Sequence, residues 1–273
     1  TRLVLIRCPE HKPIKNNNMT MYQLLKLGPQ FPAIAILFFI LGYPTSVSAE
    51  EPLPLLNAAY LTFPPMAYTD EQGNARGSII ELTNELAADS GYRIHWINYP
   101  INRIYRSLSN GNIDLWPGSQ HVPALADFTL ESKPLDYNVK LCAFSFSGST
   151  PLTSTEDLID KQLVLIRGYT YRGQLKAVFD RAAHQPIVAP DHTAAMQLLA
   201  TGRAEYLISY GHPMQESLAN HPLHQTHCDK LGEWPLVFVV SRRNPDAQQI
   251  ADNLDAAYQR YVASQQQDSQ PEH

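Results

Sequence analysis

The chain has 273 residues, of which 44% are hydrophobic and 17% are charged. It is long and apolar enough for one large folded domain or two small ones, and its composition is unlike that of a disordered protein. Its 26 acidic residues outnumber 21 lysines and arginines, for a net charge of −5 at pH 7. This acidic balance argues against a nucleic acid partner and gives no reason to expect binding to an anionic membrane.

Residues 19–49 have the pattern of a secretory signal peptide. Lys26 precedes an apolar run from Phe31 to Leu41, and the small residues Val47 and Ala49 precede the expected cleavage site. The alternative is a membrane anchor, but the run is far shorter than the ~20 residues that a spanning helix needs. We expect cleavage after Ala49 and a periplasmic mature chain, with residues 1–18 being upstream sequence.

The first half of the mature chain alternates predicted strands with predicted helices. Apolar residues at helical spacing predict helices, and short apolar runs or period-two alternation predict strands. Pro100 is suited to the start of the second helix and Gly111 to its end. The expected elements are strand 54–60, helix 78–89, strand 93–97, helix 100–110 and strand 113–116, followed by a polar loop at 117–121.

The pattern continues through the second half. Asp191 is a suitable cap for one helix and Asn244 for the last one. The expected elements are strands 139–146, 162–166, 204–209 and 235–241, a helix after the turn at 167–168, a helix after Asp191 and a helix after Asn244. Strands that alternate with helices predict parallel sheets with helices on both faces.

One spacing occurs twice in the chain. Leu108-x-x-Gly111-x-x-Asp114 and Leu199-x-x-Gly202-x-x-Glu205 each place a helix end, a glycine cap and an acidic residue before a buried strand. The repeat indicates two similar α/β lobes.

Five stretches, in their order along the chain, resemble type II periplasmic solute-binding proteins of family 3, whose best-known members bind amino acids for ABC importers. They are "AAYLTFPPMAYTDEQGNARGSIIELTNELAADSGY", "GNIDLWPGS", "DLIDKQLVLIRGYT", "TGRAEYLIS" and "PLVFVVSRRNPDAQQIADNL". The resemblance covers residues 54–262. It implies an α/β fold of two lobes, each a mostly parallel sheet flanked by helices, which close around a small ligand.

The resemblance also implies how the chain is divided. Residues 50–141 and 231–263 would form lobe 1, residues 142–230 would form lobe 2, and residues 264–273 would be a polar tail. Two antiparallel hinge strands would lie near 135–141 and 231–236. The protein would be a monomer, partnered by an ABC permease or by a membrane receptor.

The positions that match the family's cleft can be named one by one. Phe63 corresponds to an aromatic residue that packs on the ligand, Ile101 stands where an aromatic residue is usual, and the turn at 167–170 offers N–H groups to an anion. The expected ligand-binding residues are Tyr60, Phe63, Arg103, Trp116, Gly118, Ser119, His121, Arg167, Gly168, Tyr169, Thr170 and Tyr210.

The sequence departs from the family at the amino-acid clamp. Ala126 stands where an arginine usually pairs with the ligand α-carboxylate, and Tyr210 where an aspartate usually holds the α-ammonium. A bidentate arginine–carboxylate pair is strong and specific in geometry. We therefore expect a small polar ligand other than a free α-amino acid, with Arg103 or Arg167 as candidate replacements for the missing arginine.

Several assignments have alternatives. Trp116 fits either the core or the cleft, and the tyrosines at 169, 171 and 210 fit either a ligand-stacking cluster or scattered half-buried positions. Binding for ABC-type uptake is the main hypothesis, and an exported sensor or a dehydratase-like enzyme on the same fold are the alternatives.

The implied hinge strands also predict where the two cysteines of the mature chain lie. Cys142 and Cys228 would lie at the same end of the hinge pair, close enough for a disulfide, and two buried free thiols are the alternative.

The histidine-rich stretch 221–229 matches no structural zinc spacing and is expected to be a surface loop. No dinucleotide, P-loop or HExxH motif occurs, so no cofactor and no metal are expected.

Overall fold

The computed structural model describes residues 52–146, 149–173, 175–220 and 226–268. The predicted upstream segment and signal peptide, residues 1–49, lie outside the described residues, as do positions 221–225 of the histidine-rich stretch. None of the described helices is long and apolar enough to cross a membrane.

The sheet of lobe 1 has a parallel centre. Strands β4 (Arg93–Asn98), β1 (Leu55–Tyr60) and β5 (Leu115–Ser119) are parallel and neighbours in that order. The last residues of β11 (Thr226–Ser241) join β5 antiparallel, and the short strand β6 (Thr129–Glu131) pairs with the other edge of β11.

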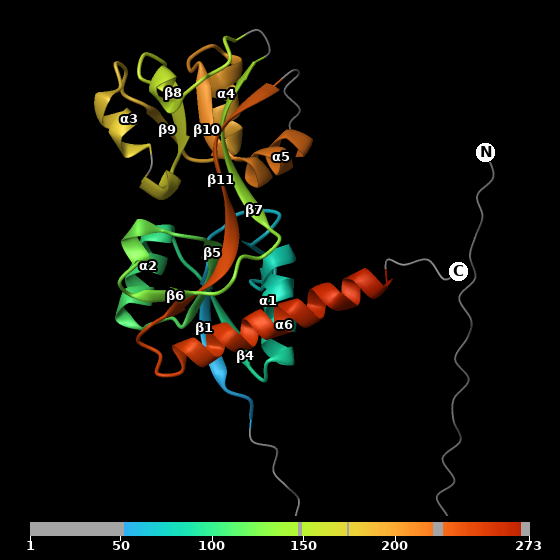
Figure 1. The fold of residues 1–273 in the computed structure, drawn as a ribbon. Helices are drawn as coiled ribbons and strands as arrows, with labels where there is room; N and C mark the ends of the chain where they lie inside the picture. The colour runs from blue at the N-terminus through green and yellow to red at the C-terminus, as the bar shows by residue number, and fades with distance from the viewer. Residues whose placement is uncertain (1–51, 147–148, 174, 221–225, 269–273) are drawn as a thin grey trace, which may run out of the picture. The chain divides into compact units, whose positions relative to one another are not determined.

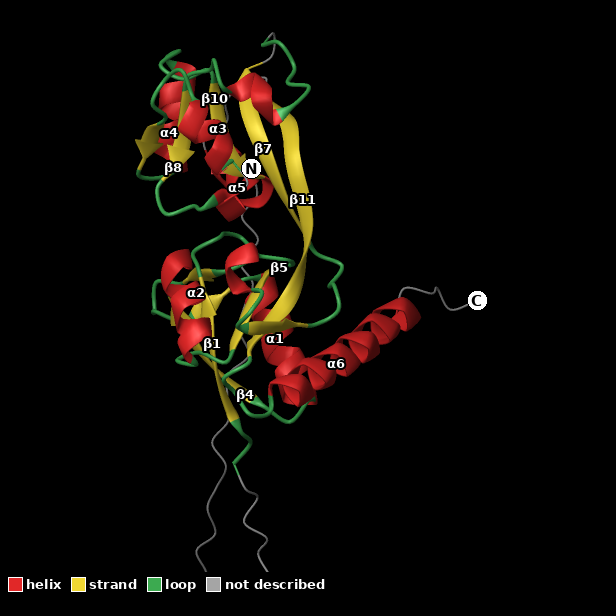
Figure 2. Cartoon of the chain, turned by 60° about the vertical axis from the view of Figure 1, so that its left-hand side comes forward, coloured by secondary structure: helices red, strands yellow, loops and turns green. Residues whose placement is uncertain are grey.

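Helices cover both faces of this sheet because its buried strands carry apolar side chains on both sides. Helix α2 (Ile101–Asn110) packs on one face, where Ile104 and Leu108 contact the cluster that contains Val237. Helices α1 (Ser78–Asp89) and α6 (Ala247–Asp268) pack on the other face, around Phe238 and Leu254. Figure 2 shows α1 and α6 close together.

The sheet of lobe 2 repeats this plan. Strands β10 (Tyr206–Tyr210), β8 (Leu163–Ile166) and β9 (Ile187–Ala189) are parallel, and β7 (Asn138–Phe146) pairs antiparallel with β10. Helices α4 (His192–Ala200) and α5 (Gly211–Asn220) cover one face, and α3 (Lys176–Arg181) packs over the other. The expected fold of two lobes, each a mostly parallel sheet flanked by helices, is confirmed.

Two long strands connect the sheets. Figure 1 shows β7 and β11 side by side, and they pair antiparallel from Asn138 opposite Pro235 to Phe146 opposite Thr226. The register shifts once, between Lys230 and Gly232. Strand β11 therefore contributes hydrogen bonds to both sheets.

Local sequence sets several of the observed boundaries. Helix α1 spans the predicted residues, and Gly111 ends α2 in the left-handed conformation with φ 76°. Asp191 begins α4, where its Oδ1 accepts a hydrogen bond from the N–H of Ala194 over 2.8 Å.

Other boundaries differ from the prediction. Pro117–Ser119, expected as a loop, belongs to β5 because this segment pairs with β11. Thr226–Asp229, expected as a surface loop, begins β11 because it pairs with β7. Residues 264–268, expected in the polar tail, continue α6 because the glutamines there are good helix formers.

Short elements were not predicted at all. They are α5, β6, β9 and a hairpin of β2 (Tyr68–Thr69) and β3 (Ala75–Arg76). In the hairpin, Oδ1 of Asp70 accepts from the N–H groups of Gln72 and Asn74. This is the local side-chain turn that aspartate favours.

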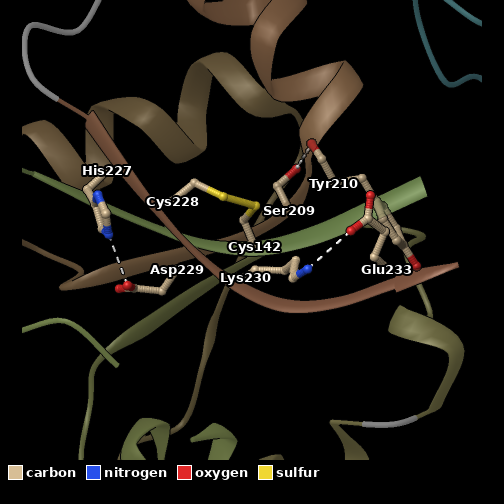
Figure 3. The surroundings of a disulfide bond; sticks show 8 residues. All are labelled: Cys142, Ser209, Tyr210, His227, Cys228, Asp229, Lys230 and Glu233. Atoms are coloured by element: carbon tan, nitrogen blue, oxygen red, sulfur yellow. Dashed lines mark hydrogen bonds and ion pairs between the residues drawn. A yellow bond between two sulfur atoms is a disulfide. The ribbon is translucent and has the colours of Figure 1, made fainter. Parts of the chain in front are cut away.

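A disulfide joins β7 to β11 (Figure 3). It links Cys142, which is buried against α4 and α5, to Cys228, with 5.4 Å between the Cα atoms. On β11, His227 contacts Asp229 and Lys230 pairs with Glu233.

Candidate functional site

A cavity of about 80 Å³ is lined by residues of both lobes. Lobe 1 contributes the end of β1 and the segment after it, the N-terminal turn of α2 and strand β5, and lobe 2 contributes the segment after β8 and the end of β10. In open α/β sheets, ligands bind beyond the carboxyl ends of the strands. The cavity lies at such ends in both lobes.

The structure gathers most of the predicted site residues around this cavity. They are Tyr60, Phe63, Trp116, Gly118, Ser119, Tyr169, Thr170 and Tyr210. Ile101 lines the cavity too, as an aliphatic wall, and Tyr105 one helical turn later adds an aromatic one that the sequence analysis did not single out.

Arg103, Arg167 and Gly168 do not line the cavity. Arg103 is exposed on α2, and its guanidinium lies 4.0 Å from the ring centroid of Tyr99. Because Ile101, Ile104 and Leu108 form the buried face of α2, position 103 faces away from it. Arg167 and Gly168 are exposed in the turn after β8. Neither arginine is placed to replace the missing clamp.

His121 contributes its backbone rather than its side chain. The imidazole is exposed and lies 3.7 Å from Glu131, whose other carboxylate oxygen accepts from the N–H of His121 over 2.8 Å. The carbonyl oxygen of His121 accepts a hydrogen bond from Arg172. Residue 121 therefore takes part in a contact between the lobes.

Ala126 also lies away from the aromatic cavity. It lines a separate pocket of about 420 Å³ with His121, Glu131 and Arg242. The position where the family carries its arginine thus borders a different hollow in this chain.

Aromatic rings also meet at the junction between the lobes. The ring centroid of Phe63, in lobe 1, lies 5.4 Å from that of Tyr210 and 6.2 Å from that of Tyr169, both in lobe 2. Tyr169 and Tyr210 are 5.3 Å apart, and Tyr171 stacks on Tyr210 at 6.2 Å. Such pairs favour tilted or edge-to-face geometries. The tyrosines therefore form one cluster rather than scattered half-buried positions.

Burial makes these phenols harder to ionise than an exposed tyrosine. It raises the pKa of Tyr169, Tyr171 and Tyr210 well above the usual value of 10. It also raises the pKa of Tyr105, although a hydrogen bond with the Thr170 side chain and the charge of Arg172 oppose the rise. Neutral phenols can both donate and accept hydrogen bonds.

Trp116 belongs to the core and also lines the cavity, the two positions between which the sequence could not decide. Its ring lines the cavity, yet the residue is only 4% exposed and packs in the cluster under α2, with Tyr105 at 5.6 Å. A Cβ at Gly118 would overlap this ring. Glycine at 118 therefore allows the indole to lie across β5.

Arg172 is the one charged residue in the described lining of the cavity, and the sequence did not point to it. It is only 9% exposed, its Nη2 donates to the His121 carbonyl oxygen over 3.0 Å, and its guanidinium lies 4.4 Å from the ring centroid of Trp234. Its Nε and Nη1 find no hydrogen-bond partner among the described residues. Burial lowers the pKa of Arg172, an effect opposed by Tyr210, Tyr105 and Glu131.

The backbone explains why Arg172 was missed. A helix is expected after the turn at 167–170, but the segment Tyr171–Gly173 intervenes and α3 begins only at Lys176. Tyr171 and Arg172 adopt left-handed φ angles of 48° and 56°. The Tyr171 hydroxyl holds this turn by accepting from the N–H of Ile166 and donating to the Ile208 carbonyl. The only sequence signal was an arginine close after a buried strand, in "GYTYRG".

The described residues contain no cluster of three or more His, Cys, Asp or Glu side chains that could hold a metal. In the histidine-rich stretch, His227 instead hydrogen-bonds Asp229 over 3.0 Å.

Solved structures with this fold include binding proteins and a sensor. The chain superposes on a histidine kinase sensor domain with similarity to periplasmic binding proteins, with a TM-score of 0.64, 17% identity and coverage of 78% of this chain and 92% of that one. An ancestral arginine-binding protein bound to arginine gives a TM-score of 0.62 at 20% identity, covering 78% and 94%. Holo ArgBP from T. maritima gives 0.59 at 18%, covering 76% and 90%.

No curated protein matches the chain. A family model, described as bacterial extracellular solute-binding proteins, family 3, matches residues 56–268, which include both sheets, the two connecting strands and helix α6. The chain belongs to the family 3 bacterial extracellular solute-binding proteins.

Proposed function

We propose that this protein binds a small solute in the aromatic cavity and that its two lobes close around the solute. The observation that carries the proposal is the lining of one cavity by both lobes, with Phe63 meeting Tyr169 and Tyr210 across it. A ligand held by both lobes favours the closed arrangement by the difference in its affinity for the two states.

The paired strands β7 and β11 are suited to act as the hinge. They are the long connections between the sheets, and the register shift at Lys230–Gly232 interrupts their regular pairing. Irregularities of this kind bend and twist a strand locally. The lobe bounds that we propose remain 50–141 with 231–263, and 142–230.

The proposed ligand is not a free α-amino acid. The related structures were solved with arginine and with glutamine bound, and these ligands carry both an α-carboxylate and an α-ammonium. In this chain Ala126 lines a different pocket, and the phenol of Tyr210, which burial makes harder to ionise, stands where the family places an aspartate. No described Asp or Glu side chain lines the aromatic cavity to hold an ammonium group.

We further propose that the protein is exported to the periplasm and acts there as a monomer. The observations that support export are the apolar run at 31–41 and the small residues before Glu50. Delivery to an ABC permease is the expected role, as for the best-known members of the family. Ligand sensing through a membrane receptor is the second candidate, favoured by the structural similarity to a histidine kinase sensor domain.

Binding rather than catalysis fits the cavity's chemistry. Its described lining offers neutral phenols, hydroxyls and one guanidinium, with no carboxylate or imidazole side chain to transfer a proton near neutral pH.

A thermal-shift screen tests the proposal. Residues 50–273 would be screened against amino acids, sugars, polyamines, peptides and carboxylic acids, and a ligand at 100 times its Kd adds about 2.7 kcal/mol of stability. Trp234, near the hinge, is a natural fluorescent reporter of closure, and Trp234→Phe would remove its signal. If no compound in any class raises the melting temperature, the proposal is wrong.

A further inference from the structure

We propose that Arg172 is the anion receptor of the aromatic cavity, and that the ligand is a small carboxylate with an apolar or aromatic body and no ammonium group. This inference rests on the proposed function and names the substrate class of the same site.

The guanidinium of Arg172 is buried without an anionic partner among the described residues. Arg172 is nine-tenths buried, lines the cavity and has no ion pair within 4 Å among the described residues. Burying a cation without an anionic partner is costly. The ring of Trp234 and the carbonyl oxygen of His121 offset part of that cost, but Nε and Nη1 still lack acceptors among the described residues. These N–H groups are donors that a ligand carboxylate can satisfy.

Three titratable groups lie around the guanidinium. Glu131 and the phenols of Tyr105 and Tyr210 are the groups whose electrostatic influence reaches Arg172. The Glu131 carboxylate is engaged with the backbone and imidazole of His121, and Glu131 lines the separate pocket rather than this cavity. Because Arg172 itself lines the aromatic cavity, its positive charge is available to a ligand there.

The rest of the cavity lining suits an apolar ligand body. The remaining walls are largely aromatic and aliphatic, with Phe63, Ile101 and Tyr169 among them, and the few hydroxyls include Ser119 and Thr170. The apolar body of a ligand is stabilised when its surface moves from water into contact with these walls. An ammonium group would be repelled by Arg172 and would meet no described carboxylate in the lining, so a zwitterion should bind less well than its deaminated analogue.

Arg172 lies in lobe 2, whereas the arginine that usually binds the ligand in this family lies in lobe 1. Arg172 follows β8, whereas position 126 follows β5. Its hydrogen bond to His121 crosses between the lobes, so a carboxylate bound to Arg172 would be held at the junction that closes. Anion binding and lobe closure would then depend on the same side chain.

Two matched sets of compounds test this assignment by calorimetry. The aromatic set is hydrocinnamate, phenylalanine and hydrocinnamyl alcohol, and the aliphatic set is isocaproate, leucine and isohexanol. Within each set only the charged group changes. We expect the carboxylate of at least one set to bind at least about tenfold more tightly than its amino acid and its alcohol.

Variants then assign the preference to the residue. Arg172→Gln should weaken carboxylate binding at least about tenfold and abolish the preference over the alcohol, while Arg172→Lys, which keeps the charge but loses the planar fork, should be intermediate. Arg106→Gln, at an exposed arginine of α2, is the control and should bind like the wild type. A merely structural arginine would change the stability of the free protein but not the carboxylate-to-alcohol ratio.

The contrary results are distinct. Equal or tighter binding of the alcohol or the amino acid, or an unchanged carboxylate preference in Arg172→Gln, would overturn the assignment. If neither carboxylate binds while an uncharged or cationic compound from the wider screen does, the assignment is wrong and the proposed function stands. If no compound from either collection binds, the proposed function itself fails.

Discussion

Asp114 exchanges two hydrogen bonds with Asn57: its N–H donates to the Asn57 carbonyl oxygen over 2.8 Å, and its carboxylate accepts from the Asn57 N–H over 2.9 Å. Glu205 makes the same exchange with Gln162 in lobe 2, at 2.8 and 3.0 Å. The spacing that occurs twice in the sequence therefore corresponds to a repeated structural unit. In each lobe an acidic residue at the start of one strand hydrogen-bonds to the neighbouring strand segment.

The first prediction concerns how much these hydrogen bonds contribute to the stability of the protein. Asp114 also accepts from the side-chain amide of Asn244 over 2.8 Å, so Asp114→Ala removes two side-chain hydrogen bonds from a half-buried site. We expect a loss of about 2–3 kcal/mol in the free energy of unfolding, measured by urea denaturation. Glu205→Ala, at an exposed residue, should cost less, and Asp127→Ala, also exposed, serves as the control. Equal effects of Asp114→Ala and Asp127→Ala would contradict this role.

The second prediction concerns the aromatic contact between the lobes. Phe63→Leu keeps an apolar side chain but removes the ring that meets Tyr169 and Tyr210. An aromatic pair contributes about 0.5–1.5 kcal/mol beyond its buried area, so we expect ligand affinity to fall roughly 2- to 10-fold. Phe128→Leu, at an exposed phenylalanine outside the cavity, should leave the affinity unchanged. Titration calorimetry with a ligand found in the screen distinguishes the two results.

The third prediction concerns Gly118. An added methyl group would overlap the ring of Trp116, which must then move within a packed wall of the cavity. We expect Gly118→Ala to destabilise the fold by about 1–3 kcal/mol and to weaken ligand binding at the same time. Gly211→Ala is the comparison, because its φ is not positive, a Cβ there would come no closer than 3.7 Å to its neighbours, and the residue does not line the cavity. Undiminished binding by Gly118→Ala would show that the indole position does not matter to the ligand.

The fourth prediction concerns the disulfide. Cys142 and Cys228 are 86 residues apart, and the chain-entropy model assigns a loop of that length about 4–5 kcal/mol of stability. The double variant Cys142→Ser, Cys228→Ser should therefore unfold at lower urea concentration. Mass spectrometry without reductant should find the cross-linked peptide in protein from the periplasm. Complete alkylation of both cysteines in denatured, unreduced protein would contradict the bridge.

The fifth prediction concerns pH. Burial lowers the pKa of His192 below 6.5, with a small opposing effect from Asp191, and its Nε2 lies 2.8 Å from the Ser209 hydroxyl, with Tyr169 packed beside it. As the pH falls through about 6.5, the unfolded chain takes up a proton that the folded chain does not, so acidification favours unfolding.

His192→Gln should therefore lose less stability than the wild type between pH 7.5 and 5.5, as measured by urea denaturation at each pH. His184→Gln, at an exposed histidine, is the matched control and should follow the wild type. The idea fails if His192→Gln and the wild type lose stability in parallel.

The fold was predictable where local sequence and tertiary structure agree. Helix α1 combines an apolar stripe with Gly91 just beyond its end, and its predicted bounds match the structure. The predicted strand bounds were wrong where pairing with another strand sets the boundary. Pro117–Ser119 carries loop-forming residues, yet its pairing with β11 makes it part of the sheet. Strand propensity depends strongly on such partners.

The site was predictable in part for a related reason. Tyr60 and Tyr210 could be placed at the cavity because they match the family's cleft positions at the ends of strands, where open α/β sheets bind ligands. Arg172 could not, because its inward orientation depends on left-handed backbone angles at two residues that are not glycine. These conformations are unusual for such residues and follow from tertiary contacts rather than from local preference.

The sharing of β11 between the sheets has a consequence for how the chain folds as it is made. Both lobes complete their sheets with residues 226–241, which come after every other described strand of the two sheets. Until that strand emerges, β5 and β7 each have an open edge, and open edges are prone to pair with other chains. Neither lobe can reach its final hydrogen-bonded state early, so a chain that stops before residue 226 would leave both halves unfinished at once.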